Sequence, residues 1–236
     1  MAVPPSHRAD ALLDAPVASL GARNAALLSL RARLFGRTQA LRCTCVHCGG
    51  TNEFSVDCDA LAGSLVPPAG ADGLHALKTA GYVVEFRAPT SAMLNHCVML
   101  NHGVIPSEAK DVGPGSSGDL FADALVSSCV IHCRDSTGTE CSPAALPDEV
   151  IEALGNALEH IEPGASVEFD VVCADCGGQW SAPMDCADVV WSEIQARAER
   201  LMLDIDVLAR AYGWREDDVL ALSDTRRAAY LQLAGG

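Results

Sequence analysis

The chain has 236 residues, of which 49% are apolar and 20% are charged, a composition typical of a globular protein rather than a disordered one. Its formal net charge of −15 argues against a broad nucleic-acid-binding surface, because such surfaces need Lys and Arg to displace counterions. No basic start followed by an apolar stretch suggests a signal peptide, and no run approaches the ~20 apolar residues that cross a bilayer. We therefore expect a cytoplasmic protein without a membrane partner, in which the eleven cysteines favour metal binding over disulfides.

Residues 1–42 are predicted to form an N-terminal helical arm. A helix over residues 21–41 is indicated by leucines near helical spacing, namely Leu27, Leu28, Leu30 and Leu34. Arginines lie among them, namely Arg23, Arg31, Arg33 and Arg37. These arginines could bind phosphate or an acidic partner, but we favour a solvated helix face.

Residues 43–187 are predicted to form an α/β domain that contains the same cysteine motif near each end. The motif is Cys-x-x-Cys-Gly-Gly, and we call its copies knuckle 1 (residues 45–50) and knuckle 2 (residues 173–178). Each knuckle is followed at the same distance by Asp-Cys, at residues 57–58 and 185–186. Two copies in one register are not expected by chance, and we interpret them as two halves of a single site.

The chemistry of the knuckles predicts a structural zinc site. Each Cys-x-x-Cys pair places both sulfurs on one side of a tight turn, and the glycine that follows accepts the backbone conformation of that turn. Four thiolates complete the closed tetrahedral shell of a structural zinc ion, with no position open to a substrate. The predicted ligands of this one ion are Cys45, Cys48, Cys173 and Cys176.

Two redox motifs or two disulfides are the alternatives for these four cysteines. A redox Cys-x-x-Cys usually follows a strand and opens a helix, whereas the double glycine after each knuckle opposes a helix. Cys58 and Cys186 are expected to pack in the core, because a free cysteine behaves as a small apolar residue. Two further groups suggest metal binding without matching a ligand template strongly; they are His96, Cys97 and His102, and Cys129, His132 and Cys133.

Between the knuckles, the sequence predicts an α/β insert. Strands are expected at residues 53–57, 82–87, 129–133 and 167–172, and the second has Tyr82, Val84 and Phe86 on one face. Helices are expected at residues 92–101, at residues 119–128 and from Pro147 onward. The last of these helices has Val150, Ile151, Leu154 and Leu158 on one face. Residues 63–73 and 106–118 are rich in Gly and Pro and are expected to be connections.

Residues 188–236 are predicted to form a C-terminal helical arm. A continuous apolar stripe indicates a long helix, and its members are Val190, Ile194, Ala198, Leu201, Ile205, Leu208 and Tyr212. Gly213 ends this helix, and two short helices follow at residues 216–222 and 224–233, with Ser223 as the cap between them. The expected fold class is α+β, with zinc-ribbon-like paired knuckles flanking an α/β insert and a C-terminal long helix plus helical hairpin.

Three segments of the chain, residues 27–57, residues 86–91 and residues 173–233, carry a resemblance to a known family, and the last of them is the most specific. They resemble the T-even phage-type baseplate proteins, found in contractile phage tails and related injection particles. The last segment includes Gln179-Trp180, Trp191–Ile194, Leu208–Trp214, Val219–Ser223 and Arg226–Leu231. The resemblance implies a structural or assembly role at the tail baseplate or hub, with other baseplate, hub or tail proteins as partners.

The residues agree with a role that is not enzymatic and has no small-molecule substrate, because the sequence contains no nucleotide-binding loop, nucleophile elbow or paired-carboxylate signature. We therefore expect a zinc-stapled baseplate component, made in the cytoplasm and placed in the tail baseplate or injection particle. Three alternatives remain open: an assembly chaperone absent from the mature particle, a zinc-ribbon nucleic-acid-binding regulator, and a dithiol oxidoreductase, which would need an exposed cysteine of low pKa.

Overall fold

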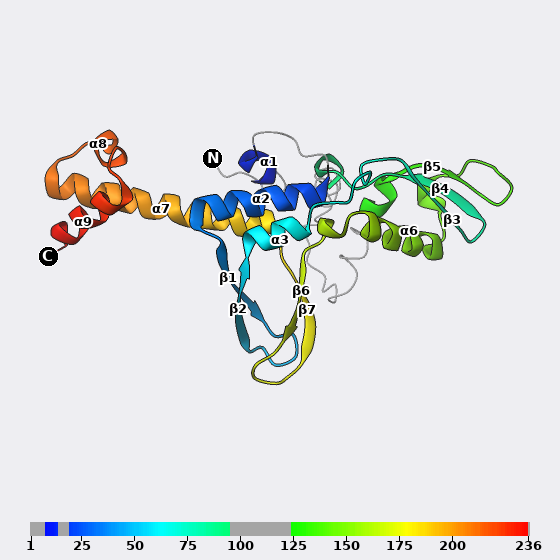
Figure 1. Ribbon diagram of the computed structural model, residues 1–236, viewed down its shortest axis with the longest axis horizontal. Helices are drawn as coiled ribbons and strands as arrows, with labels where there is room; N and C mark the ends of the chain where they lie inside the picture. The colour runs from blue at the N-terminus through cyan, green and yellow to red at the C-terminus, as the bar shows by residue number, and fades with distance from the viewer. Residues whose placement is uncertain (1–7, 14–18, 95–123, 236) are drawn as a thin grey trace, which may run out of the picture. The chain divides into compact units, whose positions relative to one another are not determined.

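The computed structural model describes residues 8–13, 19–94 and 124–235, and its mixture of helices and strands confirms the expected α+β class (Figure 1). The chain divides into two compact units, with the boundary between Asp188 and Val189. Helix α7, Cys186–Tyr212, crosses this boundary. In the part of the chain that the structure describes, no helix is both long and apolar enough to span a bilayer.

The first unit contains two β-hairpins that carry the knuckles. Knuckle 1 connects β1 (Thr38–Thr44) to β2 (Thr51–Asp57), and knuckle 2 connects β6 (Glu168–Val172) to β7 (Gln179–Pro183). Both pairs are antiparallel and have no other strand beside them in their sheets. The expected strands at 53–57 and 167–172 are therefore confirmed, and each has a partner that the sequence pattern did not reveal.

A helix follows each hairpin in the same way. The carboxylate of Asp57 accepts hydrogen bonds from the amides of Asp59 and Ala60, and so caps helix α3 (Cys58–Ser64). Asp185 likewise accepts from the amides of Ala187 and Asp188 at the start of α7. The repeated Asp-Cys is thus a helix N-terminus, because a carboxylate satisfies amides that have no partner within the helix. The sequence analysis predicted no helix here, and the connection expected at residues 63–73 overlaps α3 only at its last two residues.

The N-terminal helix ends earlier than expected. Helix α1 covers Arg8–Leu12 and helix α2 covers Leu20–Phe35, after which β1 begins at Thr38. Gly36, with φ +95°, ends α2 in a conformation that a side chain disfavours. The prediction of helix over residues 36–41 was wrong, because the leucine pattern continued into a strand.

Two of the interleaved arginines are structural rather than solvated. Arg23 and Arg31 are buried, which corrects the expected solvated face. Arg31 donates from Nη1 to the backbone oxygens of Gly36 (2.5 Å) and Thr38 (2.7 Å), and therefore holds the turn between α2 and β1. Arg37 lies at the surface and pairs with the carboxylates of Asp57 (2.9 Å) and Asp59 (3.0 Å).

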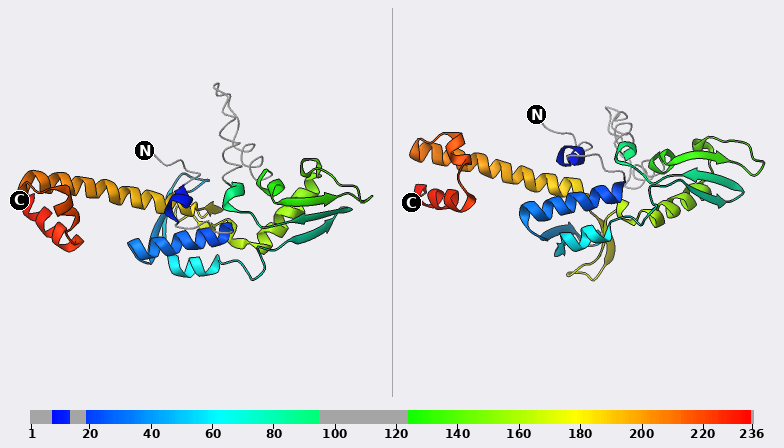
Figure 2. Two further views of the ribbon diagram at one scale, coloured as in Figure 1. Left: turned by 90° about the horizontal axis from the view of Figure 1, so that it is seen from above. Right: turned by 45° about the horizontal axis from the view of Figure 1, so that its top comes forward.

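Between the hairpins, the insert packs one helix on a three-stranded antiparallel sheet. The sheet has the order β3 (His75–Thr79), β4 (Tyr82–Phe86) and β5 (Val130–Arg134), and α6 covers Asp148–Ile161 (Figure 2). Short 3-10 turns, η2 (Pro143–Ala145) and η3 (Pro163–Ala165), flank α6. The buried core of the insert consists of Val84, Phe86, Cys129, Cys133, Leu146, Val150, Leu154 and Leu158.

These residues confirm the expected apolar faces of β4 and α6, and the strand expected at 129–133. Residues 91–94 and 124–128 are helical, in agreement with parts of two further predicted helices. Pro147 precedes α6 as its N-cap rather than forming its first position. The group His96, Cys97 and His102 and the connection at 106–118 lie outside the described residues.

The second unit is the helical C-terminal arm, where α7 is followed by α8 (Glu216–Leu220) and α9 (Asp224–Ala234). Its interior contains Leu208, Val219 and Arg227, and the rings of Tyr212, Trp214 and Tyr230 contact one another. Ser223 caps α9 as expected, by accepting from the Arg226 amide. Arg227 pairs with the carboxylates of Asp204 and Asp224.

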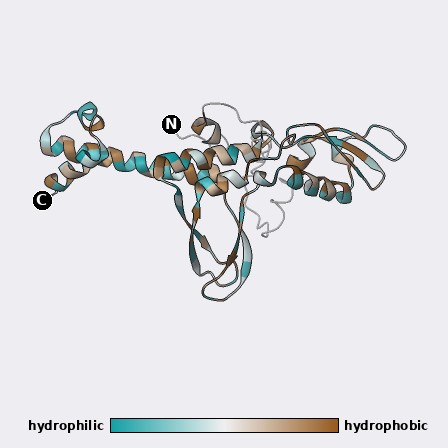
Figure 3. Cartoon of the chain, in the orientation of Figure 1, coloured by the Kyte–Doolittle hydropathy of each residue, from teal (hydrophilic) through white to brown (hydrophobic). Residues whose placement is uncertain are grey.

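Apolar and polar residues are mixed along α7 (Figure 3). Only part of its predicted apolar stripe is buried. Val190 and Leu208 are fully buried, but Ala198 is exposed. Other apolar side chains of α7 are also exposed, among them Met202, Leu203, Val207 and Tyr212. The long helix is confirmed, whereas the stripe alone did not tell which apolar residues would be covered.

Candidate metal centre

The two knuckles, although far apart in sequence, meet in space. The β1–β2 and β6–β7 hairpins run side by side and bring their connecting turns together, at the lower end of both hairpins in Figure 1. Phe54 of β2 also packs edge-to-face on Phe169 of β6, with ring centroids 5.3 Å apart. The hairpins therefore share an aromatic contact in addition to the cysteine cluster.

The four predicted ligand atoms form a compact cluster. The sulfurs of Cys45, Cys48, Cys173 and Cys176 all lie within 4.8 Å of one another. Across the knuckles, the Cys45 sulfur is 3.7 Å from that of Cys176, and the Cys48 sulfur is 3.6 Å from that of Cys173. A tetrahedral zinc with Zn–S bonds of about 2.3 Å separates its sulfurs by about 3.8 Å. The four cysteines are therefore close enough to hold a metal ion.

None of these cysteines forms a disulfide in the structure. Their separations of 3.6 and 3.7 Å also far exceed the S–S bond of about 2.05 Å. Each knuckle is a turn and not a helix start, which removes the structural context of a redox Cys-x-x-Cys. These four cysteines therefore form no disulfide, and neither knuckle has the helical setting typical of a redox Cys-x-x-Cys.

The first glycine of each knuckle allows the turn to close. Gly49 and Gly177 have φ values of +75° and +71°, in the left-handed region that favours glycine. Each donates its amide to the carbonyl of the first cysteine of its knuckle, over 2.9 Å to Cys45 and 3.0 Å to Cys173. The local sequence therefore folds both turns identically.

The second glycine of each knuckle allows the two turns to approach. A Cβ on Gly50 would overlap the carboxylate of Asp175 in knuckle 2, and a Cβ on Gly178 would overlap the ring of His47 in knuckle 1. The ring Nε2 of His47 also lies 3.2 Å from the backbone oxygen of Gln179. Each knuckle thus lays a side chain over the second glycine of the other.

Hydrogen bonds tune the sulfurs unequally. In knuckle 1, the His47 amide donates to the Cys45 sulfur and the Gly50 amide donates to the Cys48 sulfur, both over 3.4 Å. The amide of Cys176 is the main cause that lowers the pKa of Cys173, to about 6. The Gly50 amide lowers the pKa of Cys48, but hydrogen bonds with the Cys176 and Cys173 thiols outweigh it and raise that pKa to about 12. Four neighbouring thiolates would repel one another, so full ionisation calls for a cation at their centre.

The remaining cysteines occupy other environments. Cys58 and Cys186 are the first residues of α3 and α7 and are buried, as expected for core packing. Burial raises the pKa of the Cys186 thiol to about 12. Cys129 and Cys133 belong to the core of the insert, while His132 is at the surface, 3.4 Å from Glu140. Within the described ranges, only knuckles 1 and 2 gather three or more potential metal ligands.

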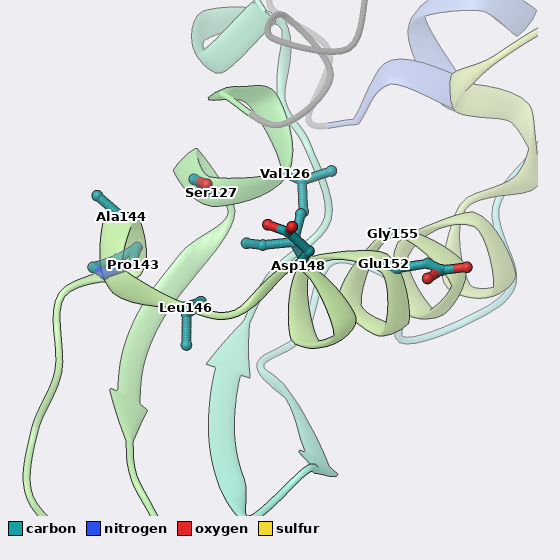
Figure 4. A pocket seen from close by; sticks show the side chains of 9 residues that line it. Val126, Ser127, Pro143, Ala144, Leu146, Asp148, Glu152 and Gly155 are labelled. Carbon is teal, nitrogen blue, oxygen red and sulfur yellow. The ribbon is translucent and has the colours of Figure 1, made fainter.

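A cavity of about 550 Å³ lies in the insert (Figure 4). None of the cysteines of the cluster lines it. It is bounded by Val126 and Ser127, by the η2 turn and by α6, which contributes Asp148 and Glu152. Asp148 lies in the first turn of α6, where a carboxylate stabilises the helix dipole. The Asp148 carboxylate therefore has a structural role that requires no ligand.

Two features of the centre escaped the sequence analysis. The side chain of His47 lies over Gly178, and the buried side chain of Asn52 reaches from β2 to knuckle 2. The sequence analysis gave the glycine after each knuckle a role in the turn, but it did not indicate that the second glycine leaves room for the other knuckle. Asn52 had no signal, because an amide in a strand is not distinctive.

No protein-family model matches this chain, and no curated protein or solved structure matches it significantly. The geometry of the cysteine cluster and the chemistry of the individual residues therefore carry the functional argument.

Proposed function

We propose that the protein is a non-catalytic structural or assembly component of the baseplate or hub of a contractile phage tail or related injection particle, stapled by one zinc ion. The observation that carries this proposal is the cluster of four sulfurs, contributed in pairs by hairpins from opposite ends of the first unit. Zinc fits this donor set, because four thiolates at tetrahedral spacing suit its preference for sulfur.

The ion would fasten the fold rather than react. Four protein ligands fill its tetrahedral shell, so a substrate has no position to enter. Apparent zinc affinities of small structural sites are about 10–16 kcal/mol, whereas a whole domain is stable by only about 5–15 kcal/mol. Removal of the ion should therefore release the two hairpins from each other.

The second unit supplies a surface suited to docking. Met202, Leu203 and Val207 project from α7 with 63%, 67% and 41% of their area exposed. A contiguous exposed apolar patch marks a surface that binds other proteins, and Leu203 and Val207 lie one helical turn apart on α7. The exposed apolar residues of α7, together with a first unit held by a metal ion, support a role in assembly.

The resemblance of residues 173–233 to baseplate proteins supplies the particular setting. It points to other baseplate, hub or tail proteins as the partners, which the protein would meet in the cytoplasm during particle assembly. The net charge of −15 makes nucleic acid a poor partner in comparison.

Metal analysis of the purified protein tests the zinc proposal directly. We expect one zinc per chain, and loss of zinc in both Cys45→Ser and Cys173→Ser. Cys43→Ser is the matched control, because Cys43 is a free cysteine on β1, two residues from knuckle 1 and outside the cluster. Zinc-free wild-type protein, or full zinc retention in Cys45→Ser, would refute the metal site.

A protein inventory of intact particles by mass spectrometry tests the assembly proposal. A permanent component is expected at fixed stoichiometry beside the other baseplate proteins. Presence in assembly intermediates and absence from mature particles would identify a chaperone instead. Salt-sensitive binding to DNA or RNA, without any association with particle proteins, would favour the regulator and reject the baseplate role.

A further inference from the structure

Asn52 connects the two halves of the cysteine cluster. It lies on β2, only two residues after knuckle 1, and 7% of its surface is exposed. Its Nδ2 donates to the Cys173 sulfur of knuckle 2 over 3.6 Å and to the Gly50 oxygen of knuckle 1 over 3.3 Å. Its Oδ1 accepts from the Ala174 amide over 3.0 Å.

The position of Asn52 follows from the strand alternation of β2. Asn52, Phe54 and Val56 are its more buried positions, whereas Thr51, Glu53 and Ser55 are exposed. Asn52 therefore points to the same side as Phe54, whose ring contacts Phe169 of β6. A buried amide is costly unless its polar atoms find partners, and here both ends of the amide find them at the cluster.

The second hairpin has no equivalent amide. Trp180 occupies the corresponding position of β7, and it pairs with Val171 as Asn52 pairs with Cys43. The side chain of Asn52 on β2 thus contacts a sulfur and a backbone amide of knuckle 2. Trp180 has no side-chain amide that could make the same contacts with knuckle 1.

We propose that Asn52 is a positioning residue of the metal centre, which fixes the Cys173 sulfur and its turn where a metal held by knuckle 1 requires them. This inference rests on the proposed zinc site. A donor aimed at a coordinating sulfur orients its lone pairs and withdraws part of its charge, and such outer contacts change metal affinity by about 10–100-fold. Asn52 also contacts both knuckles directly, so it holds the second pair of ligands beside the first.

Two substitutions separate the sulfur contact from simple packing. Asn52→Asp keeps the shape and the acceptor for Ala174, but replaces the N–H donor beside a thiolate with a negative oxygen. Asn52→Ala removes all three contacts. Gln39 provides the matched control, because it is a buried amide on β1 of the same hairpin that donates to Ala40 and to neither knuckle.

Zinc affinity is measured by competition with a chelator, and the Co²⁺-loaded protein is examined by its sulfur-to-cobalt absorption. We expect about 10–100-fold weaker zinc binding in both Asn52 variants, weaker in Asn52→Asp than in Asn52→Ala. The cobalt band should shift in both variants, which a purely structural role would not cause. Gln39→Ala and Gln39→Glu should retain wild-type affinity and spectrum.

Several outcomes would overturn the inference. Wild-type affinity in Asn52→Asp rejects it, and so does an equal loss in the Gln39 variants, which would indicate general weakening of the hairpin. If Asn52→Ala does not fold, the isosteric Asn52→Asp decides alone. Failure of wild-type protein to bind zinc would refute the proposed metal site itself, whereas tight zinc binding in every variant refutes only the role of Asn52.

Discussion

Replacing Gly178 by alanine tests whether the approach of the two knuckles sets metal affinity. Gly178 does not have a positive φ, in contrast to Gly177, so its backbone accepts alanine. The new Cβ would lie 3.1 Å from His47 Cγ, closer still to His47 Cδ2, and 3.3 Å from the Cys176 sulfur. The strain therefore comes mainly from the His47 ring of the other knuckle, because the Cys176 sulfur of the same knuckle lies only slightly closer than an ordinary contact.

The size of the effect follows from these distances. Carbon atoms pack at about 3.5–4.0 Å, so either the His47 ring leaves its contact with Gln179 or the knuckles separate by roughly half an ångström or more. Overpacking of this kind costs about 1–3 kcal/mol, which corresponds to about 5- to 140-fold weaker metal binding at 1.4 kcal/mol per tenfold. His47→Ala alone should have little effect, because His47 is exposed.

Chelator competition on the single and double variants measures this cost. Gly178→Ala should bind zinc more weakly than the wild type, and His47→Ala combined with Gly178→Ala should recover most of the loss, because the alanine then has room. Gly177→Ala should not recover with the same partner substitution, because its strain comes from φ. Equal affinities in Gly178→Ala and in the double variant would refute the steric argument.

Three further predictions concern other parts of the chain. Leu154→Ala should lower the free energy of unfolding by about 2–5 kcal/mol in denaturant titrations, because Leu154 is fully buried in the insert. The zinc content of this variant should stay at the wild-type value. A loss of zinc would contradict the view that the core of the insert and the cysteine cluster are separate. Burial raises the pKa of Glu162 above its ordinary 4.5, so the stability that protonated Glu162 contributes is complete below 4.5 and is lost as the pH rises through the folded-state pKa. Glu162→Gln should remove that slope from unfolding measured across this pH window with saturating zinc, and an unchanged slope would exclude Glu162 as its source. Leu203→Glu should leave the melting temperature nearly unchanged but reduce incorporation into particles, whereas Val66→Glu, equally exposed on the first unit, should not; equal incorporation of both would argue against the α7 surface.

Much of the local structure could be predicted from the sequence. The knuckles, the strand after the first knuckle, the strand before the second, the apolar faces of β4 and α6, the long helix α7 and the Ser223 cap all follow from patterns within a few residues. The four candidate ligands also came from local spacing, together with the repetition of that spacing far along the chain. Local geometry fixes such features because one turn or one strand decides where neighbouring side chains point.

The predictions from sequence were wrong where a local pattern was ambiguous, or where a residue distant in the sequence determines an element's end or a side chain's burial. The leucine pattern ran past Gly36, and only the positive φ there and the pairing of β1 with β2 end the helix. Arg23 and Arg31 resemble solvated helix positions in the sequence, but packing within the first unit buries them. Likewise, which residues of the α7 stripe are buried depends on which of them contact neighbouring elements of the fold.

The sequence by itself determined two turns of identical shape, each able to present two sulfurs. Only the tertiary structure decided that these turns face each other, because that requires two hairpins to pair through Phe54 and Phe169 and a glycine to leave room at each point of contact. The same packing selected Asn52, since an amide becomes a support for a sulfur only when a distant strand brings that sulfur within reach.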